Sequence, residues 1–329
     1  MANGGTDRAG GKSSEARGAA SGAVGGAAAA WRYGAQGVLS LDQARIVAIL
    51  NVTPDSFSDG GKLATPEAAA SAAAIAVEQG AAMLDIGGES TRPGAARVNA
   101  EEQIARVVPA IRAIRAMGGA AGAVPISVDT TLSSVAWAAL DAGADAINDV
   151  SAGVEDESIL PLAAERGAGV ILMHRLRPPG EDAYSDRYRE PPRYGDVVLQ
   201  VREFLLARAR RAMELGVGRD SVVIDPGLGF GKSVEDNLTL VRRVDELVGT
   251  GFAVLGAASR KSFVGRVAMG RETRPSERLA GTLAFAAALH ARGVRLFRVH
   301  DVAEHVEMMR VMDQVSGSGE SGVGSGERA

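Results

Sequence analysis

Short apolar runs recur along this 329-residue chain, and a polar residue follows at or just beyond the end of each. The eight runs are residues 46–50, 82–84, 126–128, 144–147, 170–173, 222–224, 253–255 and 296–299. Runs of this length, separated by helical patterns, predict parallel strands that alternate with helices. Eight such units in about 270 residues fit an α/β fold of the (β/α)₈ TIM-barrel class, with an open doubly wound sheet as the alternative.

The helical patterns between the runs have recognisable boundaries. Thr65 is a predicted N-cap, Pro66 fits the first helical position, and Gly80 ends an Ala-rich stretch. Further helices are predicted where apolar residues recur at helical spacing. These positions include Ile104, Val107, Ile111 and Ile114, then Val197, Val201 and Phe204, then Leu238, Val241, Val244 and Leu247.

Composition divides the chain into one domain and two predicted tails. Residues 1–40 form a Gly/Ala/Ser-rich extension and residues 315–329 a Gly/Ser/Glu-rich tail, and both lack the apolar side chains that would offset the entropy of ordering. We therefore predict a single folded domain over residues 41–314. The 46% hydrophobic and 23% charged composition is that of a globular chain.

Several classes of function are disfavoured by the same composition. The net charge of −4 argues against a nucleic-acid partner. The chain has no run of 18 apolar residues, so no membrane-spanning helix is predicted. The absence of cysteine excludes a thiolate nucleophile and a disulfide framework. We expect small-molecule substrates and a cytoplasmic location.

Polar residues at the ends of the predicted strands are the candidate site. In a TIM barrel the carboxyl ends of the strands meet at one mouth, which is where active sites lie. The residues that would ring this mouth are Asn51, Asp85, Asp129, Asn148, His174, Asp225, Lys261, Arg298 and His300. So many charged groups at a partly buried site would be costly without a ligand.

The ring contains two kinds of group. Asp129, Asn148 and Asp225 could bind the N–H edge of an amino-pyrimidinone such as a pterin, because a carboxylate accepts two parallel hydrogen bonds. Other members could bind phosphate oxygens, namely Asn51, Thr91, Arg92, Arg298 and His300. The sequence therefore predicts a polar heterocycle held deep in the barrel and a phosphate group nearer the mouth.

Eight motifs in a fixed order also resemble one known family. They are ILNVTPDSFSDGG (49–61), DIGGESTRPGA (85–95), ISVDT (126–130), IND (147–149), MH (173–174), DPGLGFGK (225–232), SRKSF (259–263) and RVHDV (298–302). Together they look like dihydropteroate synthase, and they span nearly all of the predicted domain. The resemblance implies condensation of 6-hydroxymethyl-7,8-dihydropterin diphosphate with p-aminobenzoate, requiring Mg²⁺. It further implies a homodimer and a target of sulfonamides.

The resemblance assigns roles residue by residue. The implied catalytic residues are Asn51, Asp129, Lys261, Arg298 and His300. The implied pterin-binding residues are Asp129, Asn148, Met173, Asp225, Phe230, Gly256 and Lys261. The diphosphate would be bound by Asn51, Thr91, Arg92, Arg298 and His300, with Asn51 also meeting the metal. The p-aminobenzoate site would be shaped by Thr91, Pro93 and Ser262. Loops 52–62 and 87–98 would close over the mouth, with Asp55 and Phe57 acting as lid residues.

Two alternatives stay open within this family of barrels. One is a methyltransferase that uses methyltetrahydrofolate, although that substrate has no diphosphate for Arg298 and His300 to bind. The other is a non-catalytic pterin-binding paralogue, although the Ser-Thr-Arg-Pro and Ser-Arg-Lys motifs are intact. The segment after His174 departs from the family pattern, since it is a long polar loop with three tyrosines.

Overall fold

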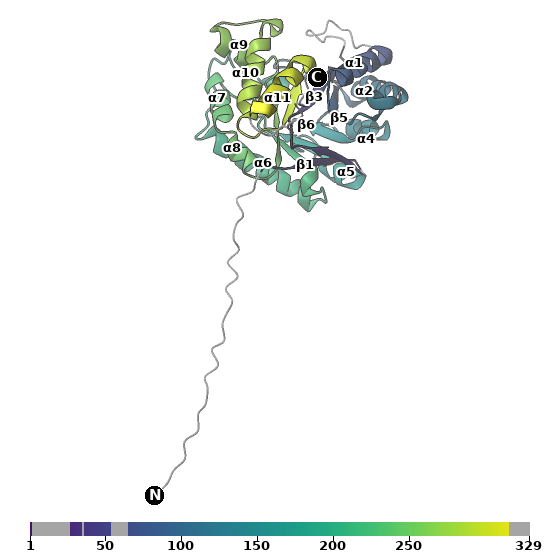
Figure 1. Cartoon of the computed structure of the whole chain (residues 1–329), viewed down its shortest axis with the longest axis horizontal. Coiled ribbons are helices and arrows are strands. Elements are labelled where there is room, and N and C mark those ends of the chain that lie inside the picture. The colour runs from purple at the N-terminus through teal and green to yellow at the C-terminus, as the bar shows by residue number, and fades with distance from the viewer. Residues whose placement is uncertain (2–26, 35, 54–64, 316–329) are drawn as a thin grey trace, which may run out of the picture.

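Eight parallel strands close into a barrel in the computed structural model, which describes residues 1, 27–34, 36–53 and 65–315 (Figure 1). The strands follow one another round the barrel in sequence order, and β10 pairs with β3 to close it. They are β3 (Arg45–Asn51), β4 (Met83–Gly87), β5 (Ile126–Asp129), β6 (Ala146–Asp149), β7 (Gly169–Met173), β8 (Val222–Asp225), β9 (Ala253–Gly256) and β10 (Leu296–Val299). The predicted TIM barrel is confirmed, and the open-sheet alternative is wrong.

Helices surround these strands in Figure 1 and cover their outward faces. They are α1 (Pro66–Glu78), α2 (Ala100–Ala116), α3 (Gly119–Ala123), α4 (Ser133–Asp141), α5 (Ile159–Arg166), α6 (Val197–Glu214), α7 (Val234–Arg242), α8 (Asp245–Val248), α9 (Ser262–Met269), α10 (Leu279–His290) and α11 (Val302–Val315). Short 3₁₀ turns lie at η1 (Pro179–Glu181), η2 (Arg219–Ser221) and η3 (Pro275–Glu277). None of the described helices is both long enough and apolar enough to span a bilayer.

Local sequence signals explain where several helices begin and end. Thr65 caps α1 as predicted, since its hydroxyl oxygen accepts a hydrogen bond from the N–H of Ala68 at 3.2 Å. The apolar positions from Leu238 to Leu247, predicted as one helix, are divided between α7 and α8 by a non-helical Arg243. Val244 and Leu247 remain buried after this break, so the outward core is preserved.

A β-hairpin precedes the barrel and covers its amino-terminal end. Strands β1 (Ala30–Tyr33) and β2 (Gly37–Ser40) pair in antiparallel fashion. Trp31 is fully buried against the lower barrel residues, and its Nε1 donates to the carbonyl of Ser221 at 3.0 Å. Residues 30–40 were predicted to belong to a disordered extension, whereas strands β1 and β2 have a packing role in the structure. One large aromatic side chain supplies the burial that composition alone failed to indicate.

Candidate active site

Charged and amide side chains from four different strands meet inside the upper end of the barrel. Arg298 on β10 donates from Nε to Asp85 on β4 at 2.6 Å and from Nη2 to Asp129 on β5 at 2.7 Å. Asn148 on β6 also donates to Asp85, at 3.0 Å, and Ser127 donates to its other oxygen at 2.6 Å. The predicted ring thus forms a connected network, because strand closure brings residues more than 200 positions apart into contact.

The electrostatics of this network leave Asp129 poorly compensated. One guanidinium faces two buried carboxylates, and Asp129 Oδ1 is buried without a hydrogen-bond partner in the described part of the chain. Burial raises the pKa of Asp129 to about 7, against the lowering effect of Arg298 and with a further raising effect from Asp85. An unpaired buried carboxylate oxygen is costly in the free protein, and a ligand N–H could satisfy it.

Asp225 at the end of β8 and Lys261, the N-cap residue of α9, form a second part of the site. Asp225 is buried, and its Oδ1 accepts from the N–H of Gly227 at 2.7 Å. Burial raises its pKa, while the nearby Lys261 ammonium lowers it. The Lys261 ammonium donates to the carbonyl of Leu228 and lies 4.6 Å from the ring centroid of Phe230. Burial lowers the pKa of Lys261 to about 8, although Asp225 opposes that shift.

Asn51 lies beside this network at the end of β3. A Cβ atom added to Gly87 would lie 3.3 Å from Asn51 Oδ1 and 3.9 Å from Asp129 Oδ2. The two side chains therefore flank Gly87, and only a residue without a side chain leaves the space between them open. Across the described ranges, no group of three or more His, Asp and Glu side chains is placed to hold a metal ion.

His300 lies just beyond β10 and bonds to the loop after β9. Its Nδ1 lies 3.0 Å from the hydroxyl oxygen of Ser259, and its backbone N–H donates to the same oxygen at 3.1 Å. Burial lowers the pKa of His300 to about 3, and the cations of Arg260 and Arg298 add to this effect. His300 is therefore neutral near pH 7 in the free protein and can act as a hydrogen-bonding group.

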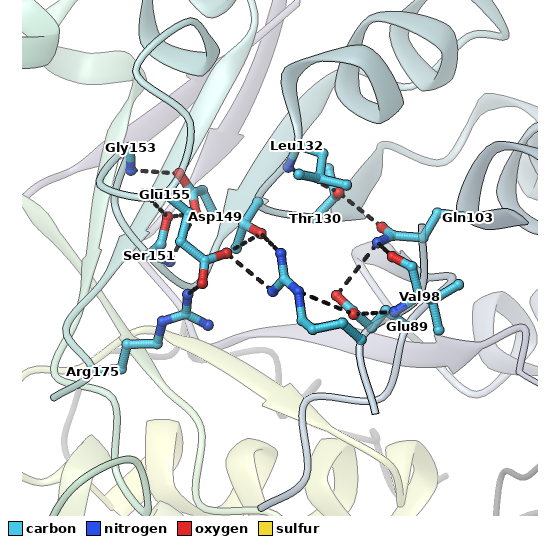
Figure 2. A network of polar contacts seen from close by, with 12 residues as sticks. Glu89, Val98, Gln103, Thr130, Leu132, Asp149, Ser151, Gly153, Glu155 and Arg175 are labelled. Carbon is cyan, nitrogen blue, oxygen red and sulfur yellow. Dashed lines mark hydrogen bonds and ion pairs between the residues drawn. The ribbon is translucent and has the colours of Figure 1, made fainter. Parts of the chain in front are cut away.

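The loop that carries the Ser-Thr-Arg-Pro motif, residues 88–98, is here called the second loop. Its two ends are tied together, since the N–H of Val98 donates to Glu89 at 2.7 Å and Gln103 donates to both residues (Figure 2). On the other side of the network in Figure 2, Glu155 accepts from Thr131 at 2.6 Å and pairs with Arg175. The predicted contact residues Thr91, Arg92 and Pro93 lie half-buried in this loop.

Some predicted site residues lie away from the network of charged side chains or outside the residues that the structure describes. A Cβ at Gly256 would lie 3.1 Å from Leu289 of α10, so this glycine makes room for helix packing on the outer face of β9. Met173 is buried at the end of β7, and Ser262 is buried in the first turn of α9. The lid residues Asp55 and Phe57 lie outside the described residues.

Two buried contacts of the candidate site were not predicted from the sequence. Asp85 was placed in the ring without a role, yet it accepts from both Arg298 and Asn148. Lys232 was seen only as the end of a Gly-rich motif. It is fully buried, and its ammonium donates to the carbonyls of Gly227 and Phe230, each at 2.9 Å. A lysine beside several glycines gives no local signal of burial, because periodicity says nothing about loops.

Lys232 also explains the state of His174. The His174 Nδ1 lies 3.0 Å from the Lys232 ammonium, and its ring contacts Phe204 edge-on. Burial lowers the pKa of His174 to about 2, and the pKa of Lys232 is lowered by burial to about 7. His174 is thus a neutral acceptor that helps to hold the lysine, as expected of a satisfied core group.

Comparisons with known proteins agree with the motifs. Residues 47–300 match the family described as pterin binding enzyme. Dihydropteroate synthase of Mycobacterium leprae is 42% identical over 280 residues, covering 83% of this chain and 94% of the relative. Dihydropteroate synthase of Streptococcus pyogenes is 43% identical over 272 residues, covering 83% of this chain and 96% of that protein.

Solved structures give the same result. Xanthomonas albilineans dihydropteroate synthase with 4-aminobenzoic acid superposes with a TM-score of 0.75 and 42% identity, covering 85% of this chain and 95% of that chain. The Yersinia pestis dihydropteroate synthase in a sulfonamide drug complex has a TM-score of 0.78 and 34% identity, over 87% of this chain and 100% of that chain. Both are similar in fold across the whole barrel.

Proposed function

The chain belongs to the dihydropteroate synthase family, and we propose that the polar mouth of its barrel is the active site. The family reaction joins 6-hydroxymethyl-7,8-dihydropterin diphosphate to p-aminobenzoate, giving 7,8-dihydropteroate and diphosphate. The observation that carries the assignment is the buried, unpartnered Asp129 Oδ1 beside Arg298 and Asp85. Such a group fits a ligand that brings its own N–H donors into the barrel.

The pterin would lie against the carboxylates. Asp225, with its raised pKa, would accept from the amino-pyrimidinone edge, and Asn148 and Asp129 would bind the other polar edge. Lys261 would meet a ring heteroatom, while Phe230 and Met173 would contact the ring faces. Asp129, Asn148 and Asp225 are each at most 5% exposed. Their hydrogen bonds to the pterin would therefore form in a low dielectric, where an unpaired polar group is costly and a correctly paired ligand is strongly favoured.

The diphosphate would lie nearer the mouth. Arg298 uses Nε and Nη2 for its two carboxylates, so Nη1 would donate to a phosphate oxygen. Neutral His300 would donate a further hydrogen bond, and Asn51, Thr91 and Arg92 would complete the site. Three or more carboxylates are not needed for Mg²⁺, which binds with few protein ligands when substrate phosphates supply the rest.

Asn51 fits such a magnesium ion because its amide oxygen lies at the strand end beside Asp129, across the open space at Gly87. When bound, Mg²⁺ supplies positive charge that stabilises the departing diphosphate. This chain's own part is to hold the diphosphate through Arg298 and His300. Thr91, Pro93 and Ser262 would orient p-aminobenzoate.

The bond changes follow from this arrangement. The amine nitrogen of p-aminobenzoate forms a bond to the methylene carbon of the dihydropterin, and the bond from that carbon to the diphosphate oxygen breaks. The amine then loses one proton to solvent or to the diphosphate. Because aniline nitrogens are weak nucleophiles, early departure of diphosphate would help, with positive charge spread into the pterin. The buried carboxylates would stabilise that charge, and loops that exclude water would protect it.

Diphosphate release by the purified chain tests this proposal. The chain is supplied with dihydropterin diphosphate and Mg²⁺, with and without p-aminobenzoate. We expect release that depends on p-aminobenzoate, together with dihydropteroate. Pterin binding without release would favour the non-catalytic paralogue, and methyl transfer from methyltetrahydrofolate would favour the methyltransferase. A homodimer and a cytoplasmic location are further parts of the proposal, and both rest on the family alone.

A further inference from the structure

The loop between β7 and α6, residues 175–195, contacts two loops that belong to different parts of the proposed site. We call it the long loop. One neighbour is the second loop, which carries Thr91, Arg92 and Pro93. The other is the glycine-rich loop, residues 226–232, which carries Phe230 and bonds to Lys261 through Leu228. The long loop therefore lies between the segments assigned to p-aminobenzoate and to the pterin.

The contact with the glycine-rich loop is specific and close. Asp182 Oδ2 accepts from the backbone N–H of Gly231 at 2.8 Å, and the hydroxyl of Tyr194 donates to the carbonyl of Gly231 at 2.7 Å. Gly231 has a positive φ of 63°, and a Cβ there would lie 2.3 Å from the Cβ of Leu176. Only glycine permits this close approach to Leu176. The long loop can therefore bond to both the N–H and the carbonyl of Gly231.

The contact with the second loop is made only a few residues away. The N–H of Gly94 donates to the carbonyl of Pro179 at 2.9 Å. The same carbonyl accepts from the backbone N–H of Asp182 at 3.2 Å, which closes the 3₁₀ turn η1. A continuous path of hydrogen bonds thus runs from Gly94 through Pro179 and Asp182 to Gly231.

Asp182 is the most strongly held member of this path. Its Oδ1 accepts from the N–H of Ala183 at 2.9 Å and from the hydroxyl of Tyr188. A second connection runs in parallel at the start of the long loop, where Arg175 pairs with Glu155 and Glu155 pairs with Arg97 at 3.0 Å. Because the parallel pairs also restrain the second loop, losing Asp182 should loosen that loop rather than release it.

We infer that Asp182 is a positioning residue that couples the second loop, assigned to p-aminobenzoate, to the glycine-rich loop, assigned to the pterin, through η1. This inference rests on the proposed function for the identity of the two substrates. It goes beyond that function because the Asp182 carboxylate bonds to Gly231, Ala183 and Tyr188, none of which is assigned to either substrate. Its carboxylate fixes Gly231 on one side, and its backbone N–H closes the turn that holds Gly94 on the other. The long loop is therefore a bridge between two substrate sites, and its effect should be felt at both.

Steady-state kinetics of Asp182→Ala test the coupling. We expect KM to rise for both substrates, by about tenfold for p-aminobenzoate, the size expected from losing a charge-assisted hydrogen bond. Asp182→Asn should restore part of the loss, because its amide oxygen can still accept from Gly231 while its amide nitrogen then faces the N–H of Ala183. Tyr188→Phe should produce a smaller change in the same direction. Glu181→Ala is the matched control, since it removes an exposed carboxylate from the same turn.

Hydrogen exchange of the free protein supplies a readout that needs no turnover. Asp182→Ala should speed amide exchange in peptides covering residues 88–98, which it does not contact directly, by about tenfold. Thermal unfolding checks that the variant is folded. A rise in KM for the pterin substrate alone, or unchanged exchange in the second loop, would overturn the inference. If the wild type releases no diphosphate, the proposed function fails, while the exchange result still decides whether the two loops are bridged.

Discussion

The two ends of the barrel interior differ sharply in chemistry although the same strands build both. Side chains two positions apart on a strand point to the same face, so one strand can contribute both a lower and an upper residue to the interior. The pairs include Met83 and Asp85 in β4, Ala146 and Asn148 in β6, Val223 and Asp225 in β8, and Leu296 and Arg298 in β10. The lower members pack against Trp31, and the upper members include the carboxylates and the guanidinium of the site.

This contrast separates what stabilises the fold from what the fold is for. Burial of apolar side chains at the lower end stabilises the folded state, because it removes apolar surface from water. Burying carboxylates at the upper end is unfavourable, and the raised pKa values of Asp129 and Asp225 reflect that cost. Stability supplied at one end allows strained electrostatics to persist at the other. Removing a buried carboxylate at the upper end and removing an apolar side chain at the lower end should therefore have opposite effects on stability.

The largest expected effect is on activity at the upper end. Asp225→Ala should abolish pterin binding and lower kcat/KM by about 10³-fold, because the site loses its main acceptor for the ligand edge. The free energy of unfolding should stay the same or increase, since a desolvated carboxylate is removed. Calorimetric titration with a pterin and urea unfolding measure the two quantities. Asp225→Asn is the control that keeps the bond to Gly227, and normal pterin affinity in Asp225→Ala would reverse the assigned orientation of the pocket.

Arg298→Ala should affect both stability and binding. Removing the guanidinium leaves Asp85 and Asp129 buried without their cation, and this should lower the free energy of unfolding by about 4 kcal/mol at pH 8. Arg298 lowers the pKa of Asp129, so its loss raises that pKa above the value near 7. A folded-state pKa above the unfolded value means that stability is retained at low pH and lost as pH rises through the folded pKa.

The loss in Arg298→Ala should accordingly be smaller at pH 5 than at pH 8. Urea unfolding at the two pH values measures the difference. Affinity for dihydropterin diphosphate should also fall more than affinity for the pterin without phosphate. Equal destabilisation at both pH values would show that Asp129 does not titrate as its raised pKa requires.

Trp31→Ala tests the lower end. Deleting this buried ring should lower the free energy of unfolding by about 3 kcal/mol, while KM and kcat stay within about twofold because no site residue moves. Trp31→Phe retains most of the apolar contact and should cost about 1 kcal/mol through the lost bond to Ser221. Thermal unfolding with parallel kinetics measures both. A large kinetic defect would mean that the two ends are not independent.

The smallest expected effect is an acid-side change in His300→Gln. The pKa of His300 is lowered to about 3 in the fold, so the unfolded chain takes up a proton that the folded chain does not as pH falls below about 6.5. Stability is therefore highest above that value and lost as pH falls. Between pH 6 and pH 5 the wild type should lose about 1 kcal/mol more than His300→Gln. Parallel slopes for the two proteins in urea unfolding would contradict a buried neutral His300.

Some parts of the molecule could be predicted because they depend on nearby residues. The cap of α1 by Thr65 and the polar residue at each strand end are local features, and both were found from spacing. The hairpin at residues 30–40 was not predicted, because its single buried tryptophan lies in a stretch of low hydrophobicity. The roles assigned to individual site residues stay predictions until the variants above are measured.

The sequence by itself determined the alternation of strands and helices, the polar ring and the family, because period, turn residues and motif order are written along the chain. Only the tertiary structure decided which members of the ring touch. The pairing of Arg298 with Asp85 and Asp129 depends on β10 closing against β3, and the bridge from Gly94 to Gly231 depends on where a long loop lies. Neither contact can be recognised from a nearby sequence pattern. Both join segments that are distant in the sequence and are brought together in space only when the barrel closes.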